Sequence, residues 1–551
     1  MLKGNNNKVI FKIIGAAVVV FILVYLAITI IGPSEGSLDG IIKDITVNTV
    51  SHPMGHVAVS PDLDDSLNED LPEISKYPPQ VNNSTPNYIE IFSSTEKAGS
   101  GTDGWLTEVA RDFNSAAITI DGKQVSVRLR GIPSGEGADY ITSGKHLPDA
   151  YTPSNELWGE MIISKGVKAE LVQERLVGNV AGVLLTKSKK DELVNKYGEI
   201  NTKTITDAVA NKELAMGYTN PFASSTGLNF LISALYTFDS SNLLSDKAKT
   251  KFESFQANIP VVSYTTLQMR ESAKSGALDG FVLEYQTYVN TPDIRYYEFT
   301  PFGFRHDNPI YAIGELSTEK RKILDKFVEF SQQEKYQTLA TEYGFNGYNE
   351  YQSETGPVSG DVIFQTQKLW KEKKKPICAV FVADVSGSMM GEPLNNLKDS
   401  LLRGQYYIGE DNMVGLVSYS YDVNIDLPIS KFDLNQRALF AGAVNDLQAG
   451  GGTATFDGIA VAMKMIQDQQ AVNSDLRPII FVLSDGETNK GHSLDDIKGI
   501  VENAGIPIYT IGYNADIPAL QAISSINEAA SINADTDDVV YKLGNLFNAE
   551  M

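Results

Sequence analysis

The chain has 551 residues, and its 69 acidic and 46 basic side chains give a formal net charge of −23 at pH 7. This length exceeds what one hydrophobic core supports, so about two to four domains are expected. The acidic balance argues against nucleic acid as a partner, because phosphate contacts need clustered lysines and arginines. A single cysteine, Cys378, excludes disulfides and cysteine-rich metal sites within the chain.

An apolar stretch near the N-terminus is long enough to cross a membrane. Residues 13–31 carry no charge, and lysines precede them while acidic residues follow them. A helix of that length spans the hydrocarbon core, and the positive-inside rule places residues 1–12 in the cytoplasm. A cleaved signal peptide is the alternative, although no small-x-small cleavage site closes the stretch. The sequence therefore predicts a single-pass anchor over 13–32 in the cell membrane, with the bulk of the chain extracellular.

Residues 33–86 are rich in proline, serine, aspartate and asparagine. A segment of this composition has little apolar surface to bury when it folds. We therefore predict a disordered linker that holds the rest of the chain away from the bilayer.

Residues 87–351 have the pattern of a second folded unit with alternating strands and helices. Apolar strand patterns occur at 88–92, 125–129 and 180–186, and an amphipathic helix pattern occurs at 105–113. This alternation is typical of α/β domains.

Three segments of this unit carry a family resemblance: PDAYTPS at 148–154, GYTNPFASSTGL at 217–228 and GFVLEYQ at 280–286. With the order of the elements, they resemble the type II solute-binding proteins of bacterial transporters. The resemblance implies two α/β lobes that close on a small solute. The hydroxyl residues before the second segment's apolar helix form a ligand site or simply cap the helix, and the sequence leaves both open. The candidate ligand residues are Ser93, Ser94, Tyr151, Ser225 and Glu284.

Residues 352–375 are predicted to be a second linker. GPVSG at 356–360 marks a boundary, and a short helix around Trp370 leads into a run of lysines. A basic run this short is expected to be a solvated surface rather than a binding patch.

Oxygen-bearing side chains gather at strand ends in the last unit, residues 376–551. Continuous apolar runs at 377–383, 479–483 and 506–512 predict parallel strands buried on both faces, with helices at 394–402 and 457–465. Open α/β sheets bind ligands at the carboxyl ends of such strands. Hydroxyl, carboxylate and water oxygens are the ligands that Mg²⁺ prefers. The residues available there are Asp384, Ser386 and Ser388 after the first strand, Thr453 on a glycine-rich loop, and Asp485 after the second strand.

These five residues match the pattern Asp-x-Ser-x-Ser, Thr, Asp of the metal-ion-dependent adhesion site. Residues 376–551 therefore resemble the von Willebrand factor type A family. The resemblance implies a doubly wound, Rossmann-like sheet that binds Mg²⁺, or another divalent cation such as Mn²⁺ or Ca²⁺. In that family an acidic side chain of a protein partner fills the open position on the metal.

The sequence favours a binding protein over an enzyme. Its five histidines are scattered, and it has neither an HExxH motif nor a Walker phosphate loop, so no catalytic residue is predicted. We predict a bacterial, membrane-anchored extracellular protein that captures a protein partner through a Mg²⁺-dependent adhesion site. The alternative is a solute-binding or sensing component of a membrane transport complex.

Overall fold

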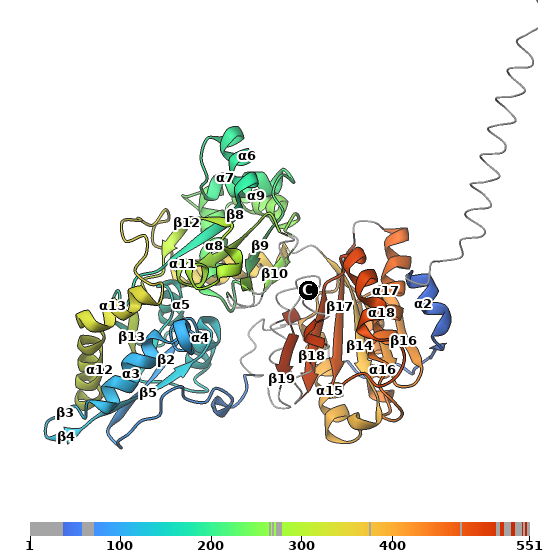
Figure 1. Ribbon diagram of the computed structural model, residues 1–551, viewed down its shortest axis with the longest axis horizontal. Helices are drawn as coiled ribbons and strands as arrows, with labels where there is room; N and C mark the ends of the chain where they lie inside the picture. The colour runs from blue at the N-terminus through green and yellow to red at the C-terminus, as the bar shows by residue number, and fades with distance from the viewer. Residues whose placement is uncertain are drawn as a thin grey trace, which may run out of the picture.

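The computed structural model contains two α/β units, coloured mainly blue to yellow and orange to red in Figure 1. None of the helices described is both long and apolar enough to cross a membrane, and the predicted anchor over 13–32 lies outside the described residues. The residues that the structure describes are 37–57, 71–259, 261–263, 266, 269–270, 278–373, 376–473, 476–513, 518, 520–522, 531–534, 543 and 546–547.

The first lobe of the middle unit is built on a five-stranded mixed sheet. Its strands are β2 (Tyr88–Ser93), β5 (Ser126–Gly131), β6 (Ala150–Thr152), β7 (Ala169–Gln173) and β13 (Ile310–Ile313), in the order β5-β2-β6-β13-β7. Strand β2 runs parallel to β5 and β6, whereas β13 is antiparallel to its two neighbours. The helices of this lobe are α3 (Trp105–Ser115), α4 (Ser134–Ser143), α5 (Leu157–Ser164), α12 (Thr318–Ser331) and α13 (Glu334–Glu342).

The second lobe holds another five-stranded sheet, in the order β10-β9-β11-β8-β12. These strands are β8 (Val180–Thr186), β9 (Met216–Thr219), β10 (Val261–Ser263), β11 (Gly280–Glu284) and β12 (Tyr297–Arg305). The chain passes between the lobes twice, between β7 and β8 and between β12 and β13. The helices are α6 (Lys187–Tyr197), α7 (Thr202–Ala210), α8 (Ser225–Phe238), α9 (Asp246–Gln256) and α11 (Tyr285–Val289).

A helix in the predicted second linker packs on both lobes. Helix α14 (Gly360–Glu372) contacts α5 of the first lobe and α8 of the second. Trp370 is fully buried, and its indole Nε1 donates a hydrogen bond to the Tyr218 hydroxyl. Residues 360–372 therefore belong to the middle unit, because the apolar face of this helix finds its burial there.

The C-terminal unit is built on a seven-stranded sheet in the order β1-β16-β15-β14-β17-β18-β19. All neighbouring strands are parallel except β15 and β16. Every residue of β14 is buried, as expected for a strand at the centre of a doubly wound sheet. The strands are β1 (Val47–Thr49), β14 (Ile377–Asp384), β15 (Met413–Tyr419), β16 (Val423–Lys431), β17 (Arg477–Ser484), β18 (Ile508–Tyr513) and β19 (Ser531–Ala534).

Helices cover both faces of this sheet. Helices α15 (Glu392–Gly404) and α16 (Leu434–Asp446) pack with Phe381 and Phe481 in one core. Helices α17 (Thr455–Val472) and α18 (Leu494–Ala504) pack with Val380 and Val482 in the other core. Cys378 is a buried free thiol in this second core. The predicted helices at 394–402 and 457–465 are confirmed, and both are longer than predicted.

Residues 37–57 form part of the C-terminal unit, which differs from the predicted disordered linker over 33–86. Helix α2 (Leu38–Asp44) buries Leu38 and Ile41 in the core with α17, and Figure 1 shows this blue helix against the orange and red unit. Strand β1 pairs in parallel with β16 at the edge of the sheet. The predominantly polar composition of residues 33–86 masks the apolar residues of this segment, which become ordered by packing against a sheet hundreds of residues away in the sequence.

The second part of the same predicted linker packs on the middle unit. Leu71 is buried in its core, and the Tyr140 hydroxyl donates a 2.7 Å hydrogen bond to the carbonyl of Pro72. Val81 forms a β-bridge with Leu129 of β5. The middle unit is therefore inserted in the sequence between β1 and β14, two strands of the C-terminal sheet.

Candidate functional site

The loop after β14 begins with a buried carboxylate. Asp384 Oδ1 accepts a 2.8 Å hydrogen bond from the backbone amide of Ser386, and Oδ2 accepts a 2.5 Å hydrogen bond from the Ser484 hydroxyl. Burial raises the pKa of the Asp384 carboxyl, these hydrogen bonds partly lower it, and the nearby charge of Asp485 raises it further. The site therefore contains a carboxylate whose charge is only partly compensated.

Two serine hydroxyls connect this strand end to the end of β17. Ser386 Oγ lies 3.0 Å from Ser388 Oγ, and Ser388 Oγ donates a 2.8 Å hydrogen bond to Asp485 Oδ1. Four of the five predicted metal ligands thus form one linked group, because parallel strands bring their carboxyl ends to the same edge of the sheet.

The fifth predicted ligand, Thr453, lies on a loop that is held against this group. The Gly387 amide donates a 3.1 Å hydrogen bond to the Gly451 carbonyl, and the Gly450 amide donates a 2.8 Å bond to the Val385 carbonyl. Gly451 has a φ of +93°, and the Tyr421 ring would lie 2.9 Å from any Cβ at this position. Both the conformation and the close contact require glycine.

A residue absent from the predicted set fixes Thr453. The Thr453 amide donates a 3.0 Å hydrogen bond to Asn489 Oδ1, and Asn489 Nδ2 donates a 3.3 Å bond to Thr453 Oγ1. Ser484, the partner of Asp384, was not predicted as a site residue either. Its position as a hydroxyl at the end of β17, directly before Asp485, is the signal that could have identified it.

The donor set fits a hard divalent cation. Two carboxylates and two hydroxyls offer oxygen only, and neither Asp384 nor Asp485 forms an ion pair with a basic side chain in the part of the chain that the structure describes. A cluster of three or more histidine, cysteine or acidic side chains suited to a metal is absent from the described residues. Any cation at this site would therefore depend on the serine and threonine hydroxyls as well as on the two aspartates.

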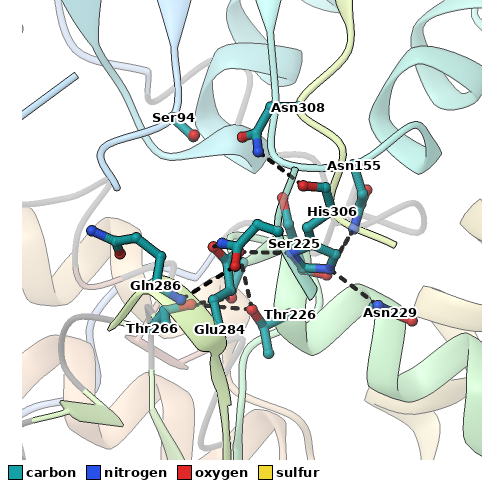
Figure 2. A network of polar contacts seen from close by, with 12 residues as sticks. Ser94, Asn155, Ser225, Thr226, Asn229, Thr266, Glu284, Gln286, His306 and Asn308 are labelled. Atoms are coloured by element: carbon teal, nitrogen blue, oxygen red, sulfur yellow. Dashed lines mark hydrogen bonds and ion pairs between the residues drawn. The ribbon is translucent and has the colours of Figure 1, made fainter. Parts of the chain in front are cut away.

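A polar network occupies the middle unit where its lobes meet, with Glu284 at its centre (Figure 2). The buried Glu284 carboxylate accepts hydrogen bonds of 2.7 Å from Asn179 Nδ2 and 2.7 Å from His306 Nδ1, and a longer one of 3.4 Å from the Thr226 hydroxyl. Asn155 of the first lobe donates to the Ser225 carbonyl of the second. The network thus joins both lobes beside the start of α8.

The family comparisons agree with this division of the chain. Residues 379–548 match the model of the von Willebrand factor type A domain, and residues 97–346 match that of the bacterial extracellular solute-binding protein. The chain joins these two families. Both families are binding modules, so the chain has the architecture of a binding protein. We refer below to the type A domain and the solute-binding domain.

The curated relatives match about a quarter of the chain. Inter-alpha-trypsin inhibitor heavy chain H3 of Bos taurus is 29% identical over 153 residues, which is 26% of this chain and 17% of the relative. Uncharacterized protein sll0103 of Synechocystis is 28% identical over 160 residues, which is 28% of this chain and 36% of the relative. The chain therefore spans well under two thirds of the length of these relatives.

Solved structures are similar to parts of the chain. Iron-bound HitA from Pseudomonas aeruginosa has 13% identity and a TM-score of 0.38, and the match covers 52% of this chain and 99% of that chain. The von Willebrand factor type A protein from Catenulispora acidiphila has 17% identity and a TM-score of 0.30, with 32% of this chain and 43% of that chain covered.

The predicted ligand residues of the solute-binding domain have different environments. Glu284 lies in the polar network, and Ser225 Oγ accepts a 2.8 Å hydrogen bond from the Trp158 indole. Ser94 Oγ accepts a 2.7 Å hydrogen bond from the ammonium of Lys97, and Ser93 Oγ donates to the Ser94 carbonyl.

Tyr151 differs from the prediction, because its ring lies in the hydrophobic core and its hydroxyl donates a 2.6 Å hydrogen bond to the Ser134 carbonyl. Tyr151 occupies β6, a strand that is paired on both sides. Side chains along a strand alternate between the two faces of the sheet, and the Tyr151 side chain is on a face that packs in the core. Sequence reasoning also missed polar residues of this region that belong to no short motif: Glu96, Lys97, Asn155, Thr266 and His306.

Proposed function

We propose that the chain is a membrane-anchored extracellular binding protein that captures an acidic side chain of a protein partner through a divalent cation in its type A domain. When bound, such a cation supplies a positive charge with an open coordination position for a carboxylate oxygen. Mg²⁺ suits the all-oxygen donors best, and Mn²⁺ or Ca²⁺ are alternatives. The residues that would hold it are Asp384, Ser386, Ser388, Thr453 and Asp485.

One observation carries this proposal. Two carboxylates from neighbouring strands are linked through Ser388 and Ser386 within hydrogen-bond distance, and no basic side chain among the described residues pairs with either. Like charges that approach each other without compensation are costly, and a bound cation removes that cost.

The surface around the site supports a protein as the partner. Met390, two residues after Ser388, is 69% exposed, and Tyr421, which packs on Gly451, is 63% exposed. The Lys490 ammonium lies 6.0 Å from the centre of the Tyr421 ring. Exposed apolar side chains beside a basic group favour a partner with an acidic residue and apolar neighbours.

The remainder of the proposal concerns location and chemistry. The uncharged stretch over 13–32 supports a membrane anchor with residues 1–12 in the cytoplasm and the rest outside. We also propose that the chain is not an enzyme, because both of its domains belong to families of binding modules.

Capture of the partner tests the main proposal. The full chain in detergent micelles would be immobilised and exposed to surface proteins of the source cell, either with Mg²⁺ or with a chelator. A partner retained only with Mg²⁺, lost by Asp384→Ala and kept by Asp468→Ala is expected, since Asp468 lies on the exposed face of α17. Equal retention by the Asp384→Ala variant would overturn the mechanism.

A second candidate function is supported by the polar network of the solute-binding domain. We propose that this domain binds a small solute, for transport or for sensing, between its two lobes. Buried polar groups drawn from both lobes are the observation that favours it. A shift in the melting temperature of the full chain with a solute from a broad panel would support it, and a flat response would contradict it.

A further inference from the structure

Helix α14 bridges the two lobes of the solute-binding domain, and its N-terminal half is fixed to the first lobe. Its first residue, Gly360, lies so close to α5 that a Cβ at this position would be 2.2 Å from the Glu160 carbonyl oxygen. About one turn later, the centre of the Phe364 ring lies 4.3 Å from the Lys165 ammonium at the end of α5. This half of α14 therefore follows any movement of the first lobe.

The C-terminal half of α14 is fixed to the second lobe. The Gln367 side-chain amide donates a 2.8 Å hydrogen bond to the Pro221 carbonyl. The centres of the Trp370 and Phe222 rings are 5.9 Å apart. A change in the distance between the lobes would therefore displace α14, since one rigid helix cannot follow both lobes.

The segment that α14 contacts in the second lobe lies beside the polar network. Pro221 and Phe222 lie between β9 and the start of α8, where the network of Figure 2 joins the lobes. Asn220, directly before them, is fully buried, and its Nδ2 has no hydrogen-bond partner among the residues that the structure describes. Buried polar groups are normally hydrogen-bonded. A solute that bonds to Asn220 would therefore act on the same loop that holds α14.

The C-terminal end of α14 leads directly into the type A domain. Only residues 374–376 separate Lys373, the C-cap of α14, from Ile377, the first residue of β14. A connection this short leaves little slack, so a displacement of the end of α14 reaches the type A domain. Strand β14 ends at Asp384, so α14 joins the sheet at the edge opposite the candidate metal site.

Helix α15 connects these two edges of the type A domain. It begins three residues after the short helix η5 (Gly387–Met389) of the metal loop and is followed by the short helix η6 (Gln405–Tyr407). Tyr407 is half-buried and packs against the hydrophobic cluster that contains Trp370 of α14 and against the cluster that contains Leu397 of α15. Rigid elements and packed side chains carry coupling between distant sites, so a shift at Tyr407 would be carried along α15 to the metal loop.

We infer that α14 and α15 couple the two domains, so that occupation of one proposed binding site changes the affinity of the other. A solute acts through residues 220–222 and α14, a cation acts through residues 384–390 and α15, and Tyr407 is the contact at which the two routes meet. The inference rests on the two binding roles proposed above and adds a regulatory connection between them. Because coupling of binding affinities is reciprocal, Mg²⁺ alone must alter the solute-binding domain, and the test needs no solute.

Hydrogen exchange of the full chain in detergent micelles, measured with and without Mg²⁺, tests the inference. We expect Mg²⁺ to change the exchange rates in α14 and in residues 217–228 by about 5-fold or more, the low end of usual coupling between sites. The response should be absent in Asp384→Asn, which loses the charge of a predicted metal ligand. Tyr407→Ala should bind Mg²⁺ and lose the response in the solute-binding domain. Tyr296→Ala, at an exposed tyrosine of that domain, is the matched control and should keep both.

The outcomes separate this inference from the function on which it rests, because calorimetric titration shows independently whether Mg²⁺ binds. Binding with exchange changes confined to the type A domain would overturn the inference and leave the metal site intact. A full response in Tyr407→Ala would overturn the role of this contact, and the wild-type measurement decides the inference even if that variant does not fold. Absence of Mg²⁺ binding would overturn both the inference and the cation-dependent function.

Discussion

The type A site and the polar network of the solute-binding domain both place carboxylates at the carboxyl ends of parallel strands, but they compensate the charges differently. Asp384 and Asp485 are linked only through hydroxyls and one backbone amide, all at one edge of a single sheet. Glu284 accepts hydrogen bonds from the Asn179 amide, the His306 imidazole and the Thr226 hydroxyl. The first arrangement suits a compact cation held by oxygen alone, and the second suits a larger solute with several polar contacts.

The largest effect is expected from His306→Ala, which should destabilise the solute-binding domain and leave the stability of the type A domain unchanged. The substitution removes a hydrogen-bond donor from the buried Glu284 carboxylate and should lower the free energy of unfolding of the solute-binding domain by about 3 kcal/mol. Differential scanning calorimetry should show its transition at a lower temperature, with the transition of the type A domain unmoved. Equal displacement of both transitions would contradict the independence of the two cores.

Glu90, a carboxylate with basic partners in the first lobe of the solute-binding domain, should make the stability of the fold depend on pH. Burial alone would raise the pKa of Glu90, but hydrogen bonds from His146 and Arg130 and their charges lower it from 4.5 to about 2. Because the folded-state pKa is below the unfolded value, Glu90 stabilises the fold above pH 4.5, and this stability is lost as the pH falls towards 2.

Glu90→Gln should therefore cost about 2–3 kcal/mol at neutral pH and flatten the loss of stability between pH 4.5 and 2. Urea unfolding at a series of pH values measures both effects. Glu96→Gln is the matched comparison and should leave the stability at neutral pH unchanged or higher, since burial raises the pKa of Glu96 to about 7 and the charge of Glu284 contributes to that rise. A parallel acid dependence in the wild type and Glu90→Gln would contradict this assignment.

A smaller effect is expected from Ser388→Ala at the type A site. Ser388 is exposed, so the fold should be kept, while loss of its hydroxyl should weaken Mg²⁺ binding by about 10-fold. The exposed Ser430 on β16 supplies the control variant Ser430→Ala, which should bind Mg²⁺ as the wild type does. Calorimetric titration measures both affinities, and equal values in the two variants would exclude Ser388 from the site.

The smallest effect is expected where the N-terminal segment joins the type A sheet. His52 Nε2 lies 3.0 Å from Asp426 Oδ1, and Nδ1 lies 3.1 Å from Asp446 Oδ2. His52→Ala should cost about 1–2 kcal/mol and allow faster hydrogen exchange at β1 than in the wild type. Exchange that stays unchanged at residues 47–49 would show that the β1–β16 pairing alone holds the segment.

The sequence predicts a site when its residues lie close together in a recognisable order. Asp384, Ser386 and Ser388 fall within five positions after an apolar strand, so the metal ligands could be proposed before the structure. Glu96 and His306 are far apart in the sequence and belong to no motif, and only the meeting of the two lobes brings their surroundings together.

Separation in the sequence also explains where the fold differs from the prediction. The strands at 88–92 and 180–186 and the central strand of the type A domain follow from local apolar runs. The placement of β1 beside β16 depends on a pairing across the whole inserted domain, and a polar composition hides it. Local patterns thus predict elements, whereas the assignment of the N-terminal segment to a domain requires three-dimensional contacts.

The most direct test of the cation-dependent function is a calorimetric titration of Mg²⁺ into the full chain in detergent micelles. We predict saturable binding at one site that is lost in Asp384→Asn and retained in Asp468→Asn. Wild-type binding by the Asp384→Asn variant, or no binding of Mg²⁺, Mn²⁺ or Ca²⁺ by the wild type, would contradict the proposed adhesion site.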